Sequence, residues 1–242
     1  MKLLCLLTIT GLAGAQVEGK PAQASAEYDY FLLDTSVNGR YEIFAGEKSL
    51  KIISKSFGLT IYAQAPDWNV TALREEPRER AQAAYSDWQT LVIPSFNMAG
   101  VSQELKKPEQ KLAGAGVTRN IFRVKTSSYG FWQTRENRKS IVGVEILTRK
   151  TRAPRKAQDI ILHFLNLPSS LEGVPVAQDT LYSDGTKGWH LKQIQVRTLE
   201  LKESSLAPEM EKYKSRGKIN QVFLGKSAMK TFDGLSDMLG DP

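Results

Sequence analysis

The chain has 242 residues, of which 41% are hydrophobic and 24% are charged, a composition typical of folded globular proteins rather than of disordered or fibrous ones. The 33 lysines and arginines exceed the 26 acidic residues, which gives a formal net charge of +7. A single cysteine, Cys5, excludes internal disulfides and clusters that need several thiolates. The length allows one sizeable core.

The first 15 residues have the features of a secretory signal peptide. Lys2 supplies a positive start, residues 3–9 form an apolar run, and residues 13–15 have the small-x-small pattern of a cleavage site. The alternative, an uncleaved membrane anchor, is disfavoured because the apolar stretch is short for a bilayer span. A second small-x-small pattern ends at Ala26, so the cut falls after residue 15 or after Ala26. The sequence therefore predicts a periplasmic or secreted protein, with no thiol once Cys5 is removed.

A short polar tether is expected over residues 16–27, and a single α+β domain over residues 28–242. Strand-like segments follow one another at short intervals in the first part of this domain, with turn residues between them, as in an antiparallel meander. These segments are residues 28–33, 40–45, 50–54, 59–64 and 68–73. Apolar and polar residues alternate along them, so one face of the predicted sheet is apolar.

Two helices are predicted, over residues 75–88 and 155–167. In the first, Tyr85 and Trp88 belong to an apolar stripe at helical spacing, which is typical of core packing. The second follows a proline and carries one apolar face. Between the helices, residues 95–116 are rich in Gly, Lys, Pro and Gln, which predicts a flexible loop that could act as a flap.

The second half of the domain continues the sheet. Strands are predicted at residues 117–125, 140–148, 174–183, 188–202 and 219–224, and a weak tail helix at 226–239. The face that carries the apolar residues changes along the long strand, which predicts a bulge or bend near Thr198. The expected fold is a single curved antiparallel sheet, an open and unclosed barrel, with apolar helices packed on its concave face.

The sequence contains no motif for catalysis, metal binding or cofactor binding. His163 and His190 each lack another His, Cys or carboxylate at ligand spacing, so structural roles are expected for both. A nucleophile elbow, a phosphate-binding loop and a dinucleotide fingerprint are also missing from the sequence. We therefore expect a protein that is not an enzyme and needs no metal or cofactor. An enzyme with an unrecognised acid–base site is kept as an alternative.

The order of elements carries a resemblance to a known family. It begins with a signal peptide and continues with GRYEIFAGEKSLKIIS at residues 39–54 and GLTIY at 58–62. SIVGVEIL at residues 140–147, an apolar helix, and LELKESSL at 199–206 follow. This sequence resembles the periplasmic lipoprotein-carrier (lipoprotein-localisation factor-like) superfamily, whose members are unclosed antiparallel barrels with helices lining the open side.

The resemblance implies that the protein holds a lipid acyl chain or an acylated protein in a cavity between the sheet and the helices. Burial of an acyl chain releases about 0.8 kcal/mol per methylene. The candidate cargo-binding residues are taken from the strand alternation and from the apolar face of the second helix. They are Tyr41, Ile43, Leu50, Ile52, Leu59, Ile61, Val142, Val144, Ile146, Ile160, Ile161, Phe164 and Leu165.

An alternative function is that of an envelope scaffold protein with a solidly packed sheet. Its contact surface would be a cluster of basic residues before and within the second helix, which meets an acidic protein or an anionic membrane surface. The members of this cluster are Arg149, Lys150, Arg152, Arg155 and Lys156. On either interpretation we expect a monomer that does not bind nucleic acid.

Overall fold

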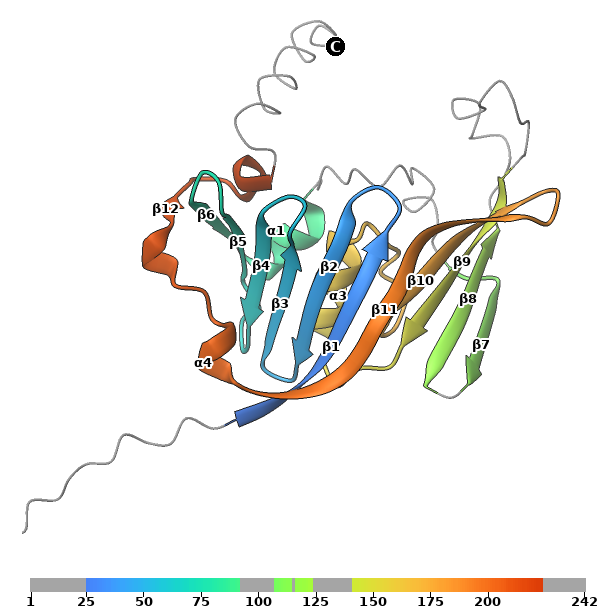
Figure 1. Ribbon diagram of the computed structural model, residues 1–242, viewed down its shortest axis with the longest axis horizontal. Helices are drawn as coiled ribbons and strands as arrows, with labels where there is room; N and C mark the ends of the chain where they lie inside the picture. Colours follow the sequence, from blue (N-terminus) through green and yellow to red (C-terminus); the bar gives the residue numbers. More distant parts are fainter. Residues whose placement is uncertain (1–24, 92–106, 115, 124–140, 224–242) are drawn as a thin grey trace, which may run out of the picture.

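The computed structural model describes residues 25–91, 107–114, 116–123 and 141–223, and the account below concerns these residues. The predicted signal peptide, the tail helix and most of the tether lie outside them. All described strands belong to one 12-stranded sheet with the order β12-β6-β5-β4-β3-β2-β1-β11-β10-β9-β8-β7 (Figure 1). Neighbouring strands are antiparallel, apart from the parallel pair of β12 and β6.

The N-terminal half is a meander of six strands in which each strand pairs with the one before it. They are β1 (Ser25–Thr35), β2 (Gly39–Gly46), β3 (Ser49–Ser54), β4 (Leu59–Gln64), β5 (Val70–Arg74) and β6 (Glu79–Ala83). The turn from β1 to β2 is closed by Thr35, whose hydroxyl accepts a hydrogen bond from the Asn38 amide and donates one to the Gly39 carbonyl. Gly39 has a φ of 71°, a conformation that favours glycine.

The other half of the sheet contains five strands, and the last of them in the chain is the longest and lies next to β1. These strands are β7 (Gln110–Gly114), β8 (Val117–Arg123), β9 (Ile141–Arg149), β10 (Val174–Tyr182) and β11 (Lys187–Lys202). Because β1 and β11 pair from Ser25 opposite Lys202 to Thr35 opposite Leu191, the two halves form one continuous sheet.

Two short helices cover one face of the sheet, which we call the inner face. They are α1 (Tyr85–Thr90) and α3 (Arg155–Phe164), and both lie behind the strands in Figure 1. The main core lies between these helices and the inner face, where the alternation of β2, β3 and β4 directs every second side chain. The predicted open antiparallel sheet with apolar helices on one face is therefore confirmed.

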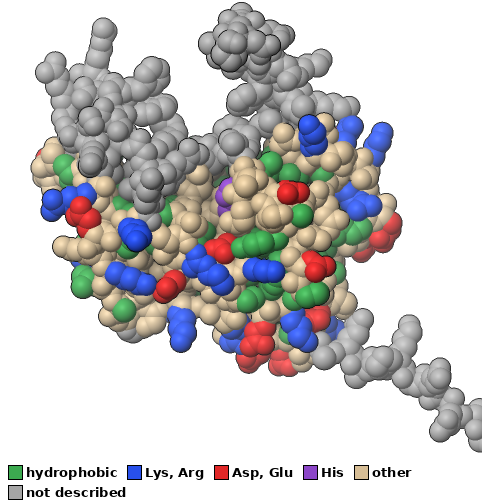
Figure 2. All heavy atoms as spheres, turned by 180° about the vertical axis from the view of Figure 1, so that it is seen from behind, with side chains coloured by type: hydrophobic (Ala, Val, Ile, Leu, Met, Phe, Trp, Pro, Cys, Tyr) green, Lys and Arg blue, Asp and Glu red, His purple; other side chains and the backbone are tan. Residues whose placement is uncertain are grey.

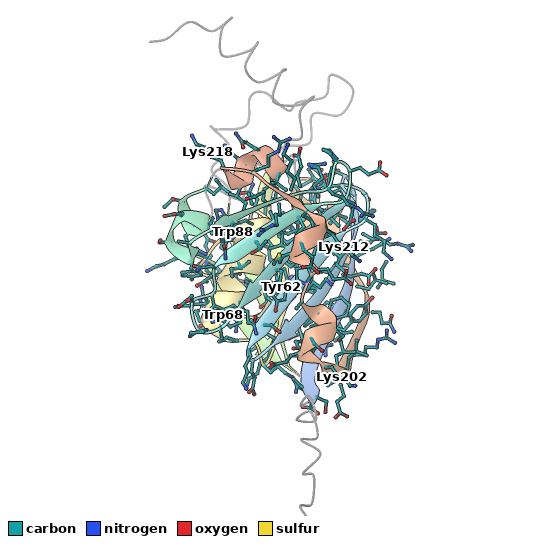
Figure 3. All side chains as sticks on the ribbon, turned by 90° about the vertical axis from the view of Figure 1, so that its left-hand side faces the viewer. Tyr62, Trp68, Trp88, Lys202, Lys212 and Lys218 are labelled. Atoms are coloured by element: carbon teal, nitrogen blue, oxygen red, sulfur yellow. The ribbon has the colours of Figure 1, made fainter. Side chains whose placement is uncertain are left out.

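The chain after β11 crosses the opposite, outer face as a strap, defined here as residues 203–215. The strap contains α4 (Glu203–Leu206), the 3-10 helix η2 (Met210–Lys212) and β12 (Lys214–Ser215). Leu206 packs there on Tyr28, Tyr62 and Leu73, and these four residues form a second, smaller cluster, the outer cluster. Figure 3 shows the strap with Lys212 on one side of the sheet and Trp88 with the helices on the other.

The predicted helix over residues 75–88 is wrong. The structure has β6 at Glu79–Ala83, and only the six-residue α1 follows it. Ala81 pairs with Ala72 of β5 and packs in the main core, so a long-range strand pair decides the conformation. The residues that gave the helical spacing belong to two elements, because Ala81 lies in β6 whereas Trp88 lies in α1.

Four further expectations need correction. The predicted loop over residues 95–116 contains β7, which pairs with β8, while its residues 95–106 and 115 lie outside the described part of the chain. Residues 219–223 are helical rather than extended. The irregularity expected near Thr198 lies at Ile194, which is the extra residue between the two partners of Leu33 and Leu32. Finally, β1 begins at Ser25, inside the predicted tether.

Candidate apolar cargo site

The structure brings twelve of the thirteen candidate cargo-binding residues into the main core, where each is at most 9% exposed. The sheet contributes side chains from β2, β3, β4 and β9, and α3 contributes the facing apolar side chains. Val142 is the exception, because it lies at the start of β9 and is 39% exposed. The predicted residues therefore form one apolar interior, and in this structure the interior is packed with their own side chains.

Helix α3 has a strongly amphipathic sequence that explains its position. Ile160, Ile161 and Leu162 are fully buried, whereas Arg155 and Lys156 in the first turn are exposed. Phe164 meets Tyr41 of β2 edge to face, with 5.5 Å between the ring centroids. Burial of this kind of apolar surface provides about 25 cal/mol per Å², so the helix is held to the sheet mainly by hydrophobic contact.

Polar side chains fix the chain that leads into α3. The Asp29 carboxylate, on the inner face of β1, accepts hydrogen bonds from the Thr151 hydroxyl and the Arg152 amide, each 2.8 Å long. The Arg152 guanidinium also pairs with Asp29 and with Glu27. Thus the loop before α3 is tied to the strand at the centre of the sheet.

A second set of polar contacts joins the helices to each other and to the next loop. The Tyr85 hydroxyl of α1 donates to the Asp159 carboxylate of α3 at 2.8 Å. The same carboxylate pairs with Arg155, whose guanidinium also donates to the carbonyls of Ser169 and Leu171. Asp159 therefore connects α1 and α3 to the loop before β10.

The structure also places an arginine at the inner face that the sequence did not single out. The Arg74 guanidinium donates to the carbonyl of Val222 at 2.7 Å, and to the carbonyls of Phe57 and Phe223. These contacts hold the helical residues 219–223 over the end of the interior. Nothing in the local pattern around Arg74 indicates this role, because two of its three partners lie nearly 150 residues further along the chain.

Aromatic rings pack against one another at this end of the interior. Trp88 is fully buried, and its ring lies 5.5 Å from that of His163 and 5.9 Å from that of Phe223, measured between centroids. The core role expected for Trp88 is confirmed. Nε2 of His163 lies 2.8 Å from the carbonyl oxygen of Leu91, and burial lowers the pKa of His163.

Burial shifts the pKa of titratable side chains in the interior and elsewhere in the sheet. Burial raises the pKa of the Tyr41 hydroxyl to about 12. Further along the sheet, burial lowers the pKa of His190, whose Nε2 lies 2.7 Å from the Thr180 hydroxyl. Both histidines therefore have structural contacts and are disfavoured in their charged form.

Several residues of the predicted basic cluster form ion pairs or ring contacts with other residues of the protein. Arg152 and Arg155 take part in the ion pairs described above, and the Lys156 ammonium lies 5.4 Å from the centre of the Tyr85 ring. Lys150 is exposed. Figure 2, which faces the helix side, shows basic and acidic side chains interspersed there.

The described residues include neither a metal-binding cluster nor a membrane-spanning helix. They contain no group of three or more His, Cys, Asp or Glu side chains that could hold a metal ion. None of the described helices is long and apolar enough to cross a membrane.

No protein-family model matches the chain, and a search of the curated proteins found no similar sequence.

Proposed function

We propose that the protein binds the acyl chain of a lipid or of an acylated protein between the inner face of the sheet and helices α1 and α3. The observation that carries this proposal is that helix α3 covers the inner face of the sheet through apolar side chains. The strands are held to each other by ladder hydrogen bonds, whereas α3 faces them with the apolar side chains of Ile160, Ile161 and Phe164. The helix can leave the sheet without breaking the ladders.

Replacement of the α3 side chains by an acyl chain on the inner face has a modest net cost in free energy. A bound acyl chain contributes about 0.8 kcal/mol for each methylene that it buries. It would replace contacts that the α3 side chains make in the closed form, so the inner face stays covered throughout. The polar contacts of Asp29 and Asp159 must then loosen, and they set the free energy of opening.

The proposal includes the site of action. Residues 1–15 have the organisation of a signal peptide, so we infer that the protein acts in the periplasm or outside the cell. An acyl chain in that aqueous compartment needs an apolar container to stay soluble.

The test is the binding of a fluorescent fatty acid to the wild-type protein and to a variant with a weakened cover. Tyr85→Phe removes the hydrogen bond to Asp159, which favours the closed form. If the closed form competes with cargo, its destabilisation raises the apparent affinity. A bond to a charged group contributes about 1.5–3 kcal/mol, so we expect binding at least several-fold tighter than in the wild type.

Tyr62→Phe is the matched control, because it removes a phenolic hydrogen bond to Gln64 on the outer face. It should leave the fatty-acid affinity unchanged. Native mass spectrometry of protein purified from its envelope should detect a bound lipid or acylated peptide. Failure of both the wild type and Tyr85→Phe to bind the fatty acid would refute the proposal.

A second candidate is a scaffold with a permanently packed sheet, and the close packing of the main core favours it. Its partner would be an acidic protein or an anionic membrane surface that contacts Lys150, Arg155 and Lys156, which are exposed. Such a contact weakens steeply as ionic strength rises, whereas acyl-chain binding does not. Titration of binding against salt distinguishes the two candidates.

A further inference from the structure

The strap forms one wall of a partly open pocket on the outer face, on the opposite side of the sheet from α3. The pocket has a volume of about 370 Å³ and is lined by β3, β4, β5, the turn after β5 and the strap. Figure 3 shows the strap passing over this part of the sheet. The volume lies at the lower end of the range for small-molecule sites.

The charges around this pocket are not balanced. Its lining includes three basic and two acidic side chains. The acidic ones have partners within the strap, because Lys212 pairs with Glu209 and the Tyr213 hydroxyl donates to Glu75 at 2.6 Å. No carboxylate of the described residues lies at ion-pair distance from Lys51 or from Arg78, the other two basic side chains.

Lys51 is in an unfavourable position for a cation without a close partner. It is half-buried on the outer face of β3, between Phe44 of β2 and Tyr62 of β4. Burial lowers the pKa of Lys51, and the more distant Glu75 only partly opposes this effect. An anion in the pocket would restore the interactions that the ammonium group loses on leaving water.

The remaining lining residues suit a ligand with an apolar part. Ala207 and Pro208 of the strap line the pocket with accessible apolar atoms, and the fully buried Leu73 lies behind the lining. The Thr60 hydroxyl belongs to the same lining and is a potential donor to an oxyanion. Thus charged and apolar surfaces meet in one pocket that is partly open to solvent.

We propose that this pocket binds a small organic oxyanion, a carboxylate or a phosphate monoester, whose charged group lies between Lys51 and Arg78. Arginine binds both groups through two parallel hydrogen bonds, and lysine adds a point charge. The apolar part of the ligand contacts Ala207 and Pro208. This site does not depend on the acyl-chain function, since it lies on the other face of the sheet.

The experiment is isothermal titration calorimetry of the full-length protein with benzoate, phenyl phosphate and the uncharged benzyl alcohol. We expect at least one of the two anions to bind and benzyl alcohol not to bind. Glycerol phosphate and dihexanoyl phosphatidic acid form a second pair of probes. Tighter binding of the phosphatidic acid identifies a lipid headgroup as the source of the anion, and equal binding identifies a free phosphate ester.

Variants separate a built site from general attraction to a basic protein. Lys51→Gln and Arg78→Gln should each weaken anion binding at least tenfold. Lys48→Gln and Lys218→Gln remove exposed lysines outside the pocket and should have no effect. Ala207→Trp fills the pocket without any change of charge and should also abolish binding.

The circular dichroism spectrum of each variant shows whether it is folded. Absence of binding by both anions at millimolar concentration would overturn the proposal. Equal weakening by Lys51→Gln and Lys48→Gln would overturn it as well, because the attraction would then be general rather than local.

Discussion

Gly173 occupies a position that no other residue fits, in the loop between α3 and β10. Its φ is 88°, and a Cβ atom there would lie 2.3 Å from the carbonyl oxygen of Arg149. Its amide donates a hydrogen bond to the Gln158 side chain of α3 at 2.8 Å. This close backbone contact places the start of β10 against the end of β9.

Gly173→Ala should therefore be more destabilising than an ordinary glycine substitution. The positive φ costs an alanine about 1–2 kcal/mol, and the contact with a backbone oxygen adds to this cost. Gly185→Ala is the control, because Gly185 has a similar φ of 81° but no atom within 4 Å of the added Cβ. Urea unfolding should give a clearly lower free energy for Gly173→Ala, and equal values would contradict the argument from close contact.

Glu145 is the other residue whose environment gives a clear expectation. Its carboxylate accepts two hydrogen bonds from Arg119, 2.8 and 3.0 Å long, and one of 2.7 Å from Lys187. The hydrogen bonds from Arg119, together with Lys187, lower the pKa of Glu145 from 4.5 to about 2, although partial burial opposes the shift. The charged carboxylate thus joins β8, β9 and β11.

The pH dependence of unfolding tests this network. Because the pKa of Glu145 is lower in the folded protein, its contribution to stability is present above pH 4.5 and is lost as the pH falls towards 2. Glu145→Gln should be less stable than the wild type at pH 6, and the difference should shrink between pH 4.5 and pH 2. A difference that is constant over this range would contradict the assignment.

Among the elements, local pattern predicted best those strands whose partner follows closely in the chain. The alternation around Tyr41, Ile52 and Ile61 gave the correct face, because each of these strands forms a hairpin with the next one. The error over residues 75–88 arose where a short strand, with three alanine or glutamate residues on its inner face, depends on β5 for its conformation. Such a segment has little β-propensity of its own.

The covering elements of the site were only partly predictable. The face of α3 was correct because its apolar residues recur at helical spacing. The role of Arg74 could not be read from the sequence, since it depends on carbonyl groups of Val222 and Phe223 that the fold brings close. Alternation also could not decide whether the inner face is open or filled, because both states use the same apolar side chains.

Arg74→Gln tests the attachment of residues 219–223. Loss of the guanidinium removes hydrogen bonds to three carbonyl groups, so this segment should separate from β5 more often. Hydrogen exchange, measured by mass spectrometry, should become faster in residues 219–223 and stay unchanged in β2 and β3. The exposed Lys48→Gln is the control, and unchanged exchange in Arg74→Gln would contradict the role given to Arg74.

At the scale of the whole molecule, the strap protects one edge of the sheet. The Lys214 amide donates to the Arg78 carbonyl at 2.9 Å, and the Arg216 amide donates to the Arg80 carbonyl at 2.7 Å. The acceptor carbonyls lie just before and within β6, which would otherwise have free hydrogen-bonding groups at the edge of the sheet. Exposed edges of this kind associate with the strands of other molecules.

Lys214→Pro should therefore promote self-association, because proline cannot donate the bond to Arg78. The expected result is concentration-dependent growth in mass, measured by light scattering after size-exclusion chromatography. Ser215→Pro is the control, because the bonds to the Arg78 and Arg80 carbonyls come from the amides of Lys214 and Arg216, on either side of Ser215. Equal association of both variants would show that the effect comes from proline itself rather than from the freed edge.

The pairing of β1 with β11 has a consequence for the time course of folding. The side chains of Ser25 and Glu200, which meet across this pair, are 175 residues apart in sequence. The two halves of the sheet can join only after nearly the whole folded region has been synthesised, and contacts of such long range slow folding. A slowly folding chain stays unfolded for longer. In the unfolded state, a polypeptide can still be threaded through a membrane pore.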